Sequence, residues 1–320
     1  MKPHYRFRTS LLALLCLSMT LILTIGVSAQ DTSAETLKLG IISSEPTDSI
    51  LTWTPFVDYL VNGLGGYGVE SGIVVVASDM ETMGNWLAEG EVDFFFDSFY
   101  TAMTTSAYAC SESSASLFLV RNRPDKSAVF FTVADSGLVT LDDLEAHLVT
   151  MEEPDSTSGF MLPMAFMLDA GYSAVEVESA DTVVADNEIG YVFAGDDEVV
   201  VQWVLRGITL AGIVDNETFE EFDAENPGQM VALVETDAVI RDQPVIFRPG
   251  FDPELYMAIE TMLLSMDESD AAQPILETTE TMQFSNFREE REEDLARAQA
   301  MFDVVSTTIF DMEAICSETE

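Results

Sequence analysis

Short apolar runs alternate with helix-like segments along most of the chain, and this alternation constrains the fold more than any other feature. Runs with the length of buried strands lie at 37–42, 73–77, 92–96, 129–133, 147–151, 191–193 and 210–214. Helix-like segments lie between them, at 53–60, 79–89, 98–108, 160–170 and 198–206. Repeated strand–turn–helix units predict an α/β protein with mainly parallel sheets. Ligands of such sheets bind at the carboxyl ends of strands, so functional residues are expected there.

The first 29 residues have the organisation of a secretory signal peptide. Three basic residues, Lys2, Arg6 and Arg8, precede an apolar stretch at 11–27, and small residues lead up to Ala29. This pattern predicts cleavage after Ala29. The apolar stretch falls short of the about 20 residues that a membrane span needs, so a retained anchor is the less favoured alternative. We expect an exported protein in the periplasm or on the extracellular face, either free or tethered.

The charge balance excludes several classes of function. The chain has 57 acidic and 13 basic residues, a net charge of −44, and only three lysines. Grooves for nucleic acid and polybasic membrane-docking surfaces both need clustered basic residues, so neither is expected. Two histidines, His4 and His147, are too few for a histidine-rich metal site. Export permits a disulfide, and Cys110 and Cys316 either form one or stay as free thiols.

The strongest chemical signal is a run of three hydroxyl side chains, Ser156, Thr157 and Ser158, between a predicted strand and a predicted helix. Hydroxyl side chains cap exposed N–H groups at a helix start, and the same end of a helix attracts anions. Gly159, which follows, lets the backbone approach another group closely. The segment can therefore bind a tetrahedral oxyanion without a basic residue. The alternative is ordinary capping by one of the hydroxyls.

This turn and its flanks resemble the signature of phosphonate-, phosphate- and phosphite-type solute-binding proteins of ABC importers. The resembling segment is Glu153-Pro154-Asp155-Ser156-Thr157-Ser158-Gly159-Phe160-Met161-Leu162-Pro163. Further matches run from about Leu37 to Pro249 and include Gly40-Ile41-Ile42-Ser43-Ser44-Glu45-Pro46 and Gly90-Glu91-Val92-Asp93. The resemblance implies a two-lobed type II periplasmic-binding fold, with a ligand cleft between lobes that close by hinge motion. Lobe I would comprise 37–131 and 244–320, and lobe II 132–243.

The resemblance also implies ligand-binding residues. Ser156, Thr157 and Ser158 would bind the phosphoryl or phosphonyl oxygens from lobe II, and Ser98 would contact the same group from lobe I. The mouth of the cleft would be lined by Ser44 and Glu45.

Three further candidates carry charge. Asp215 would face the variable part of the ligand or cap a helix. Lys126 stands where relatives usually have a tyrosine and Asp197 where many have a histidine. A carboxylate beside an oxyanion is unfavourable unless it is protonated or paired with a ligand cation. Two models stay open: Lys126 pairs with the anion while the acids cap helices, or an acid holds the ammonium of an aminoalkylphosphonate.

We therefore expect an extracytoplasmic solute-binding receptor of an ABC importer, a monomer that needs no metal or cofactor. Its ligand would be a phosphonate, phosphate or phosphite, and its ABC permease would dock on both lobes. The alternatives are an enzyme on the same fold, either a carboxylate-based lyase or a hydrolase built on His147, and a ligand-sensing partner protein. The receptor is favoured because the resemblance covers most of the chain, whereas a hydrolase could use only His147, which has no established relation to any serine.

Overall fold

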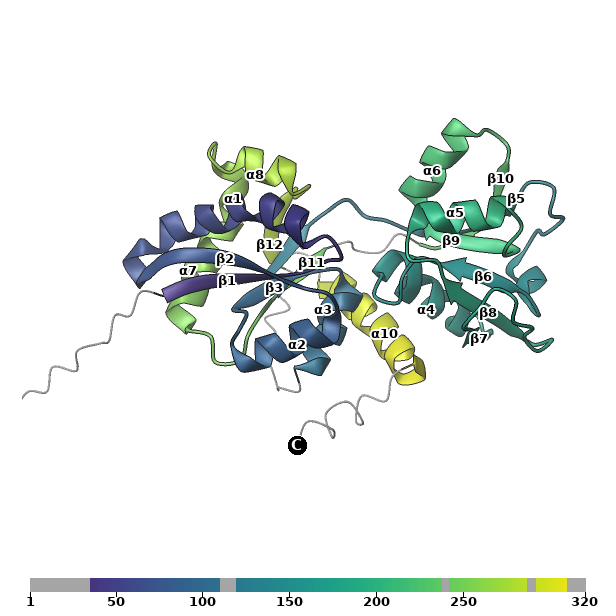
Figure 1. Cartoon of the computed structure of the whole chain (residues 1–320), viewed down its shortest axis with the longest axis horizontal. Coiled ribbons are helices and arrows are strands. Elements are labelled where there is room, and N and C mark those ends of the chain that lie inside the picture. Colours follow the sequence, from purple (N-terminus) through teal and green to yellow (C-terminus); the bar gives the residue numbers. More distant parts are fainter. Residues whose placement is uncertain (1–34, 110–118, 238–241, 287–291, 310–320) are drawn as a thin grey trace, which may run out of the picture. The chain divides into compact units, whose positions relative to one another are not determined.

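The computed structural model describes residues 35–109, 119–237, 242–286 and 292–309, which form two six-stranded sheets with flanking helices (Figure 1). The predicted signal peptide, Cys110 and Cys316 lie outside the described residues. In each sheet, parallel strands are combined with antiparallel ones, which is a two-lobed version of the predicted α/β fold. None of the helices in the described ranges is long and apolar enough to cross a membrane.

The first sheet is built around β1 (Glu35–Ile42), which pairs in parallel with β2 (Val69–Ala77) and β3 (Phe94–Phe96). The other strands are β4 (Leu119–Asn122), β11 (Gln243–Phe247) and β12 (Gln283–Asn286), and the order is β12-β4-β11-β3-β1-β2. The helices that belong with this sheet are α1 (Pro46–Leu64), α2 (Met80–Glu89), α3 (Phe99–Tyr108), α7 (Pro253–Leu264) and α8 (Gln273–Thr278).

The centre of β1 shows why these residues form a covered strand. Leu37, Leu39 and Ile41 are buried against helix side chains. Gly40, between them, faces α2 so closely that a Cβ there would lie 2.7 Å from the sulfur of Met83. The glycine therefore lets the helix pack directly on the strand.

The second sheet has the order β10-β5-β9-β6-β8-β7. Its strands are β5 (Ala128–Val133), β6 (Leu148–Met151), β7 (Ser173–Glu176), β8 (Glu188–Phe193), β9 (Ala211–Asp215) and β10 (Met230–Glu235). Its helices are α4 (Leu162–Asp169), α5 (Asp197–Leu205) and α6 (Asn216–Glu225). Met161, Met164 and Met167 are buried in the core beside this sheet, as expected for helix packing.

The chain passes from the first sheet to the second between β4 and β5, through residues 123–127, and returns between β10 and β11. The proposed boundary at 131/132 falls inside β5, which lies wholly in the second sheet. The last helix, α10 (Glu292–Ile309), packs against α4. The sheets thus place the first crossing a few residues earlier than the sequence suggested, and the division into lobes stays a prediction.

Candidate functional site

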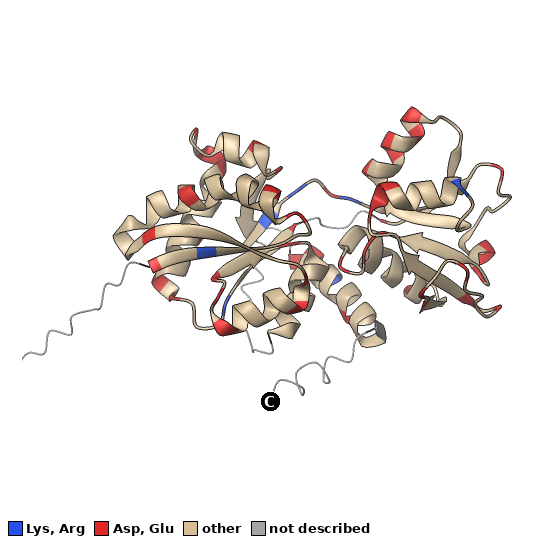
Figure 2. Ribbon diagram, in the orientation of Figure 1, with Lys and Arg blue, Asp and Glu red and all other residues tan. Residues whose placement is uncertain are grey.

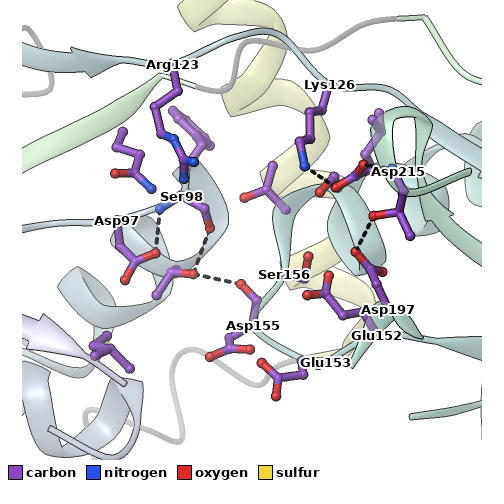
Figure 3. Close-up of a pocket in the computed structure, with 18 residues that line it drawn as sticks. Asp97, Ser98, Arg123, Lys126, Glu152, Glu153, Asp155, Ser156, Asp197 and Asp215 are labelled. Atoms are coloured by element: carbon purple, nitrogen blue, oxygen red, sulfur yellow. Dashed lines mark hydrogen bonds and ion pairs between the residues drawn. The ribbon is translucent and has the colours of Figure 1, made fainter. Parts of the chain in front are cut away.

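A cavity of about 370 Å³ lies at the carboxyl ends of strands from both sheets (Figure 3). The first sheet supplies Ile42 at the end of β1 and residues that follow β3. The second sheet supplies residues 152–158 after β6, Asp197 after β8 and Asp215 at the end of β9. This is the edge at which α/β proteins bind their ligands, because strand ends and helix starts meet there.

The hydroxyl-rich turn forms one wall of the cavity. Its helix begins with one π-helical turn, Thr157–Met161, which runs directly into α4. Ser156 is the N-cap, and its Oγ accepts the N–H of Gly159 at 2.9 Å. The first N–H groups of a helix have no acceptor within the helix. With Gly159 capped, the N–H groups of Thr157 and Ser158 are those that an anion can use.

Gly159 has no room for a side chain. A Cβ at this position would lie 2.5 Å from Oε2 of Glu152 and 2.7 Å from its Cβ. The turn therefore folds directly onto Glu152, and glycine is required for this close approach.

Two hydrogen bonds join the start of α3 to the same turn. The N–H of Tyr100 donates to Oγ1 of Thr157 at 3.0 Å, and Oγ1 of Thr101 donates to the carbonyl oxygen of Asp155 at 2.7 Å. Oγ of Ser98 lies 2.8 Å from Oγ1 of Thr101 (Figure 3). A hydroxyl both donates and accepts, so Thr157 keeps a hydrogen that it can offer to a ligand. Residues from the two sheets thus share one polar network at the cavity.

Lys126 faces the cavity from the crossing segment and is already paired. Its Nζ forms an ion pair with Oδ2 of Asp215 and lies 3.1 Å from Oε2 of Glu217. The other oxygen of Asp215 accepts the N–H of Thr218 at 2.9 Å, which caps α6. Asp215 therefore takes both roles that the sequence left open: it lines the cavity and it caps a helix.

Asp197 has different surroundings. The N-cap of α5 is its neighbour Asp196, whose Oδ1 accepts the N–H groups of Glu198 and Val199 at 2.8 and 3.2 Å. Asp197 itself lines the cavity. Its Oδ2 accepts the hydroxyl of Thr218 at 3.3 Å, and its buried Oδ1 has no hydrogen-bond partner among the described residues.

Carboxylates outnumber cations around the cavity. The carboxylates are Asp97, Glu152, Glu153, Asp155, Asp197 and Asp215, and the cations are Arg123 and Lys126. Burial raises the pKa of Asp97 to about 7, although the N–H of Ser98 partly offsets this effect. Burial, with the nearby Glu152 and Asp215, raises the pKa of Asp197 to about 8. Figure 2 shows the same imbalance over the chain, with blue residues on the segment between β4 and β5.

Seven of the nine predicted ligand-binding residues line this one cavity: Ser98, Lys126, Ser156, Thr157, Ser158, Asp197 and Asp215. Ser44 and Glu45 are not among the lining residues. They are exposed on the turn between β1 and α1, where Glu45 is the residue before the helix. The first strand contributes Ile42 instead.

Sequence reasoning missed other lining residues, among them Asp97, Thr101, Arg123, Glu152 and Gln243. Asp97 and Glu152 directly follow predicted strands, so their positions alone could have marked them. Arg123 and Gln243 lie where the chain passes between sheets, and only the tertiary structure brings them to the cavity.

Two observations on the described residues bear on the enzyme alternatives. No group of three or more His, Cys, Asp and Glu side chains among them is arranged to hold a metal ion. His147 directly precedes β6, at the opposite end of that strand from the cavity. A hydrolase that uses this histidine would need a different site.

A family model described as ABC transporter, phosphonate, periplasmic substrate-binding protein matches residues 39–294. No curated protein matches the chain. Among solved structures, XAC2383 from Xanthomonas citri, bound to chloride ion or to ATP, shares 25% identity at a TM-score of 0.77, over 86% of this chain and 99% of that chain.

Two more distant structures share the fold. PhnD1 from Prochlorococcus marinus, in complex with methylphosphonate, has a TM-score of 0.61 and 14% identity over 85% of this chain and 99% of its own. A binding protein component of an ABC phosphonate transporter from Pseudomonas aeruginosa has a TM-score of 0.52 and 16% identity, over 89% and 99%.

Proposed function

Because the chain belongs to the family of periplasmic substrate-binding proteins of phosphonate ABC transporters, we propose that its cavity binds a phosphonate- or phosphate-like oxyanion. The protein would act as an extracytoplasmic receptor, and would deliver the ligand unchanged to an ABC permease that docks on both lobes. We expect it to work as a monomer without a cofactor.

The observation that carries this proposal is the arrangement of donors around the cavity. The N–H groups of Thr157 and Ser158 lie at a helix start, and both side chains add hydroxyls. Ser98 approaches from the other sheet, and Lys126 supplies a positive charge. A tetrahedral oxyanion has several acceptor oxygens that point in different directions, so it can use donors on more than one wall.

The size of the cavity and the ligands of similar proteins support the same class of ligand. About 370 Å³ lies within the range of small-molecule sites and leaves room for a substituent on phosphorus. PhnD1 was solved with methylphosphonate, and XAC2383 was solved with chloride and with ATP. All three of these ligands are anions.

The pairing of Lys126 bears on whether the ligand carries an amine. An ammonium that approached Asp215 would compete with Lys126 for the same carboxylate. A plain oxyanion can instead share Lys126 with Asp215 without breaking their contact. The structure thus favours an oxyanion whose binding does not depend on an amine at Asp215.

The test is a binding screen of residues 30–320, the mature chain that the sequence predicts, with phosphate, phosphite, methylphosphonate and 2-aminoethylphosphonate. A ligand at a hundredfold excess over its Kd should raise the free energy of unfolding by about 2.7 kcal/mol. The triple variant Ser156→Ala, Thr157→Ala and Ser158→Ala should lose this response while staying folded. Unchanged affinity in the triple variant would reject the site, and turnover of any of these compounds would support an enzyme instead.

A further inference from the structure

Asp197 occupies a position that an ionised carboxylate tolerates poorly. It lines the cavity, and its Oδ1 is buried without a hydrogen-bond partner among the described residues. Its Oδ2 accepts one long bond of 3.3 Å from the hydroxyl of Thr218. A buried carboxylate needs donors or a cation to offset its loss of water, and the long bond from Thr218 is the one donor that these contacts supply.

The charged groups that face Asp197 make ionisation still less favourable. Glu152 follows β6 and Asp215 ends β9, and both carry negative charge toward it. The cation nearby is Lys126, on the crossing segment, and it is committed to Asp215 and Glu217. On its own element, Asp196 uses its carboxylate to cap α5, and Glu198 is exposed. When carboxylates share a site, one of them keeps its proton more readily.

A protonated carboxyl has a different chemistry from an ionised one. The ionised form only accepts hydrogen bonds, whereas the protonated form also donates one O–H. An oxyanion in this cavity needs donors, and an ionised Asp197 would repel it. When Oδ1 is protonated, its O–H has no acceptor among the described residues and is free to donate to the ligand.

We propose that Asp197 binds the oxyanion as a neutral carboxylic acid and donates its O–H to one of the ligand oxygens. The inference rests on the proposed function and deepens it, because it makes Asp197 a hydrogen-bond donor whose protonation controls ligand binding. The proton comes from solvent when Asp197 is ionised beforehand, and it returns to solvent after release. No other bond forms or breaks, so the binding equilibrium is coupled to one proton.

The raised pKa of Asp197 sets where this coupling can be measured. With a value of about 8 in the free protein, the carboxyl is mostly protonated at pH 7 and mostly ionised at pH 9. Affinity should therefore fall as pH rises through this window, since the ionised form must first take up a proton.

The experiment measures the Kd of methylphosphonate from pH 6 to 9 by calorimetry, for the wild-type protein and Asp197→Asn. The asparagine amide can donate a hydrogen bond but does not titrate. The wild-type Kd should rise about tenfold, relative to that of Asp197→Asn, between pH 7 and 9. Because both proteins bind the same probe, the titration of the probe itself cancels in this ratio.

Two further variants sharpen the result. Asp197→Ala removes the donor, so its affinity should be at least about tenfold weaker than that of Asp197→Asn at every pH. Glu198→Gln removes one negative charge from the adjacent exposed residue and should follow the wild-type profile. Calorimetry in two buffers of different ionisation heat gives the number of protons taken up per ligand bound. At pH 9 the wild-type protein should take up about 0.9 more protons per ligand than Asp197→Asn.

The inference is overturned if wild-type protein and Asp197→Asn share one pH profile and one proton count. It is also overturned if Asp197→Asn selectively loses 2-aminoethylphosphonate at pH 7, because Asp197 would then act as the ionised partner of an ammonium. Failure of the proposed function looks different: the wild-type protein would bind none of phosphate, phosphite, methylphosphonate and 2-aminoethylphosphonate at any pH, and the role of Asp197 would fail with it.

Discussion

Lys126 is held by Asp215, so the cavity presents a cation whose charge is already balanced within the protein. Both side chains are mostly buried, with exposed fractions of 11% and 6%. Removing one member of such a pair leaves the other as an uncompensated buried charge. The effect of each residue on ligand binding therefore has to be judged together with its partner.

The first prediction concerns this pair. Lys126→Ala should weaken methylphosphonate binding by more than tenfold, because the anion loses a cation and gains an unpaired carboxylate as neighbour. Adding Asp215→Asn to Lys126→Ala should restore part of the affinity. Calorimetric Kd values for the wild type, both single variants and the double variant give the coupling energy. Additive effects would show that the pair does not act as a unit on the ligand.

The second prediction separates capping from ligand contact in the hydroxyl-rich turn. Ser156→Ala should cost about 1 kcal/mol of the free energy of unfolding, because Ser156 caps the helix through the N–H of Gly159. Thr157→Ala should reduce affinity by about 1.5–3 kcal/mol, the range for a hydrogen bond to a charged group, and it should also reduce stability because the N–H of Tyr100 loses its acceptor. Thr157→Ser keeps the hydroxyl and serves as the control. Equal losses of affinity in Ser156→Ala and Thr157→Ala would contradict this division of roles.

The third prediction concerns the close approach at Gly159. Gly159→Ala should lower the free energy of unfolding by about 1–3 kcal/mol, because its Cβ would overlap Glu152 and force the turn away. Gly66→Ala is a matched control, since a Cβ there would meet no atom within 4 Å. Denaturant unfolding of both variants provides the comparison. A stability of Gly159→Ala equal to that of the control would mean that Glu152 moves aside at no cost.

The fourth prediction concerns stability against pH. Burial raises the pKa of Asp97 to about 7 in the folded protein, whereas the ordinary pKa of an aspartate in an unfolded chain is about 3.9, so the folded state binds the proton more tightly. Stability should therefore fall as pH rises from about 4 to 7, by at most about 1.4 kcal/mol per pH unit from this residue. Asp97→Asn should flatten the dependence, whereas Asp135→Asn, on an exposed turn, should not. Parallel slopes in all three proteins would remove Asp97 as the cause.

The fifth prediction concerns selectivity between phosphonates. If no ammonium binds at Asp215, Asp215→Asn should change the affinities for methylphosphonate and 2-aminoethylphosphonate by the same factor. The ratio of the two Kd values is the informative quantity, because effects on folding cancel in it. A tenfold selective loss of 2-aminoethylphosphonate, about 1.4 kcal/mol, would instead show that Asp215 holds the amine.

The regular part of the fold was predictable from local sequence. The apolar runs at 37–42, 73–77 and 210–214 lie within or overlap β1, β2 and β9, and the hydroxyl-rich turn begins a helix as expected. β1 and β9 have strong local patterns, because strands buried on both faces are continuously apolar. β2 is an edge strand and is partly exposed, but its run of β-branched residues still predicts a strand.

Other elements have no such pattern. β4 contains the buried Arg121, whose guanidinium bonds to Gln243 and to Thr279 and Thr281, residues more than a hundred positions away. Arginine is rarely buried without partners, so the sequence alone predicts an exposed position for Arg121. Two carboxylates of the cavity, Asp97 and Glu152, were not predicted, although each directly follows a predicted strand. The sequence does not show that these two strand ends meet at one cavity, and only the tertiary structure brings them there.

The two cations of the cavity, Arg123 and Lys126, both lie on the short segment that carries the chain from β4 to β5. Arg123 is tied to Glu280, beside β12, and Lys126 to Asp215, at the end of β9, so each holds the segment to a different sheet. A mutation of either cation therefore changes two properties at once: the charge that the ligand meets, and the contacts that hold the segment connecting the two sheets.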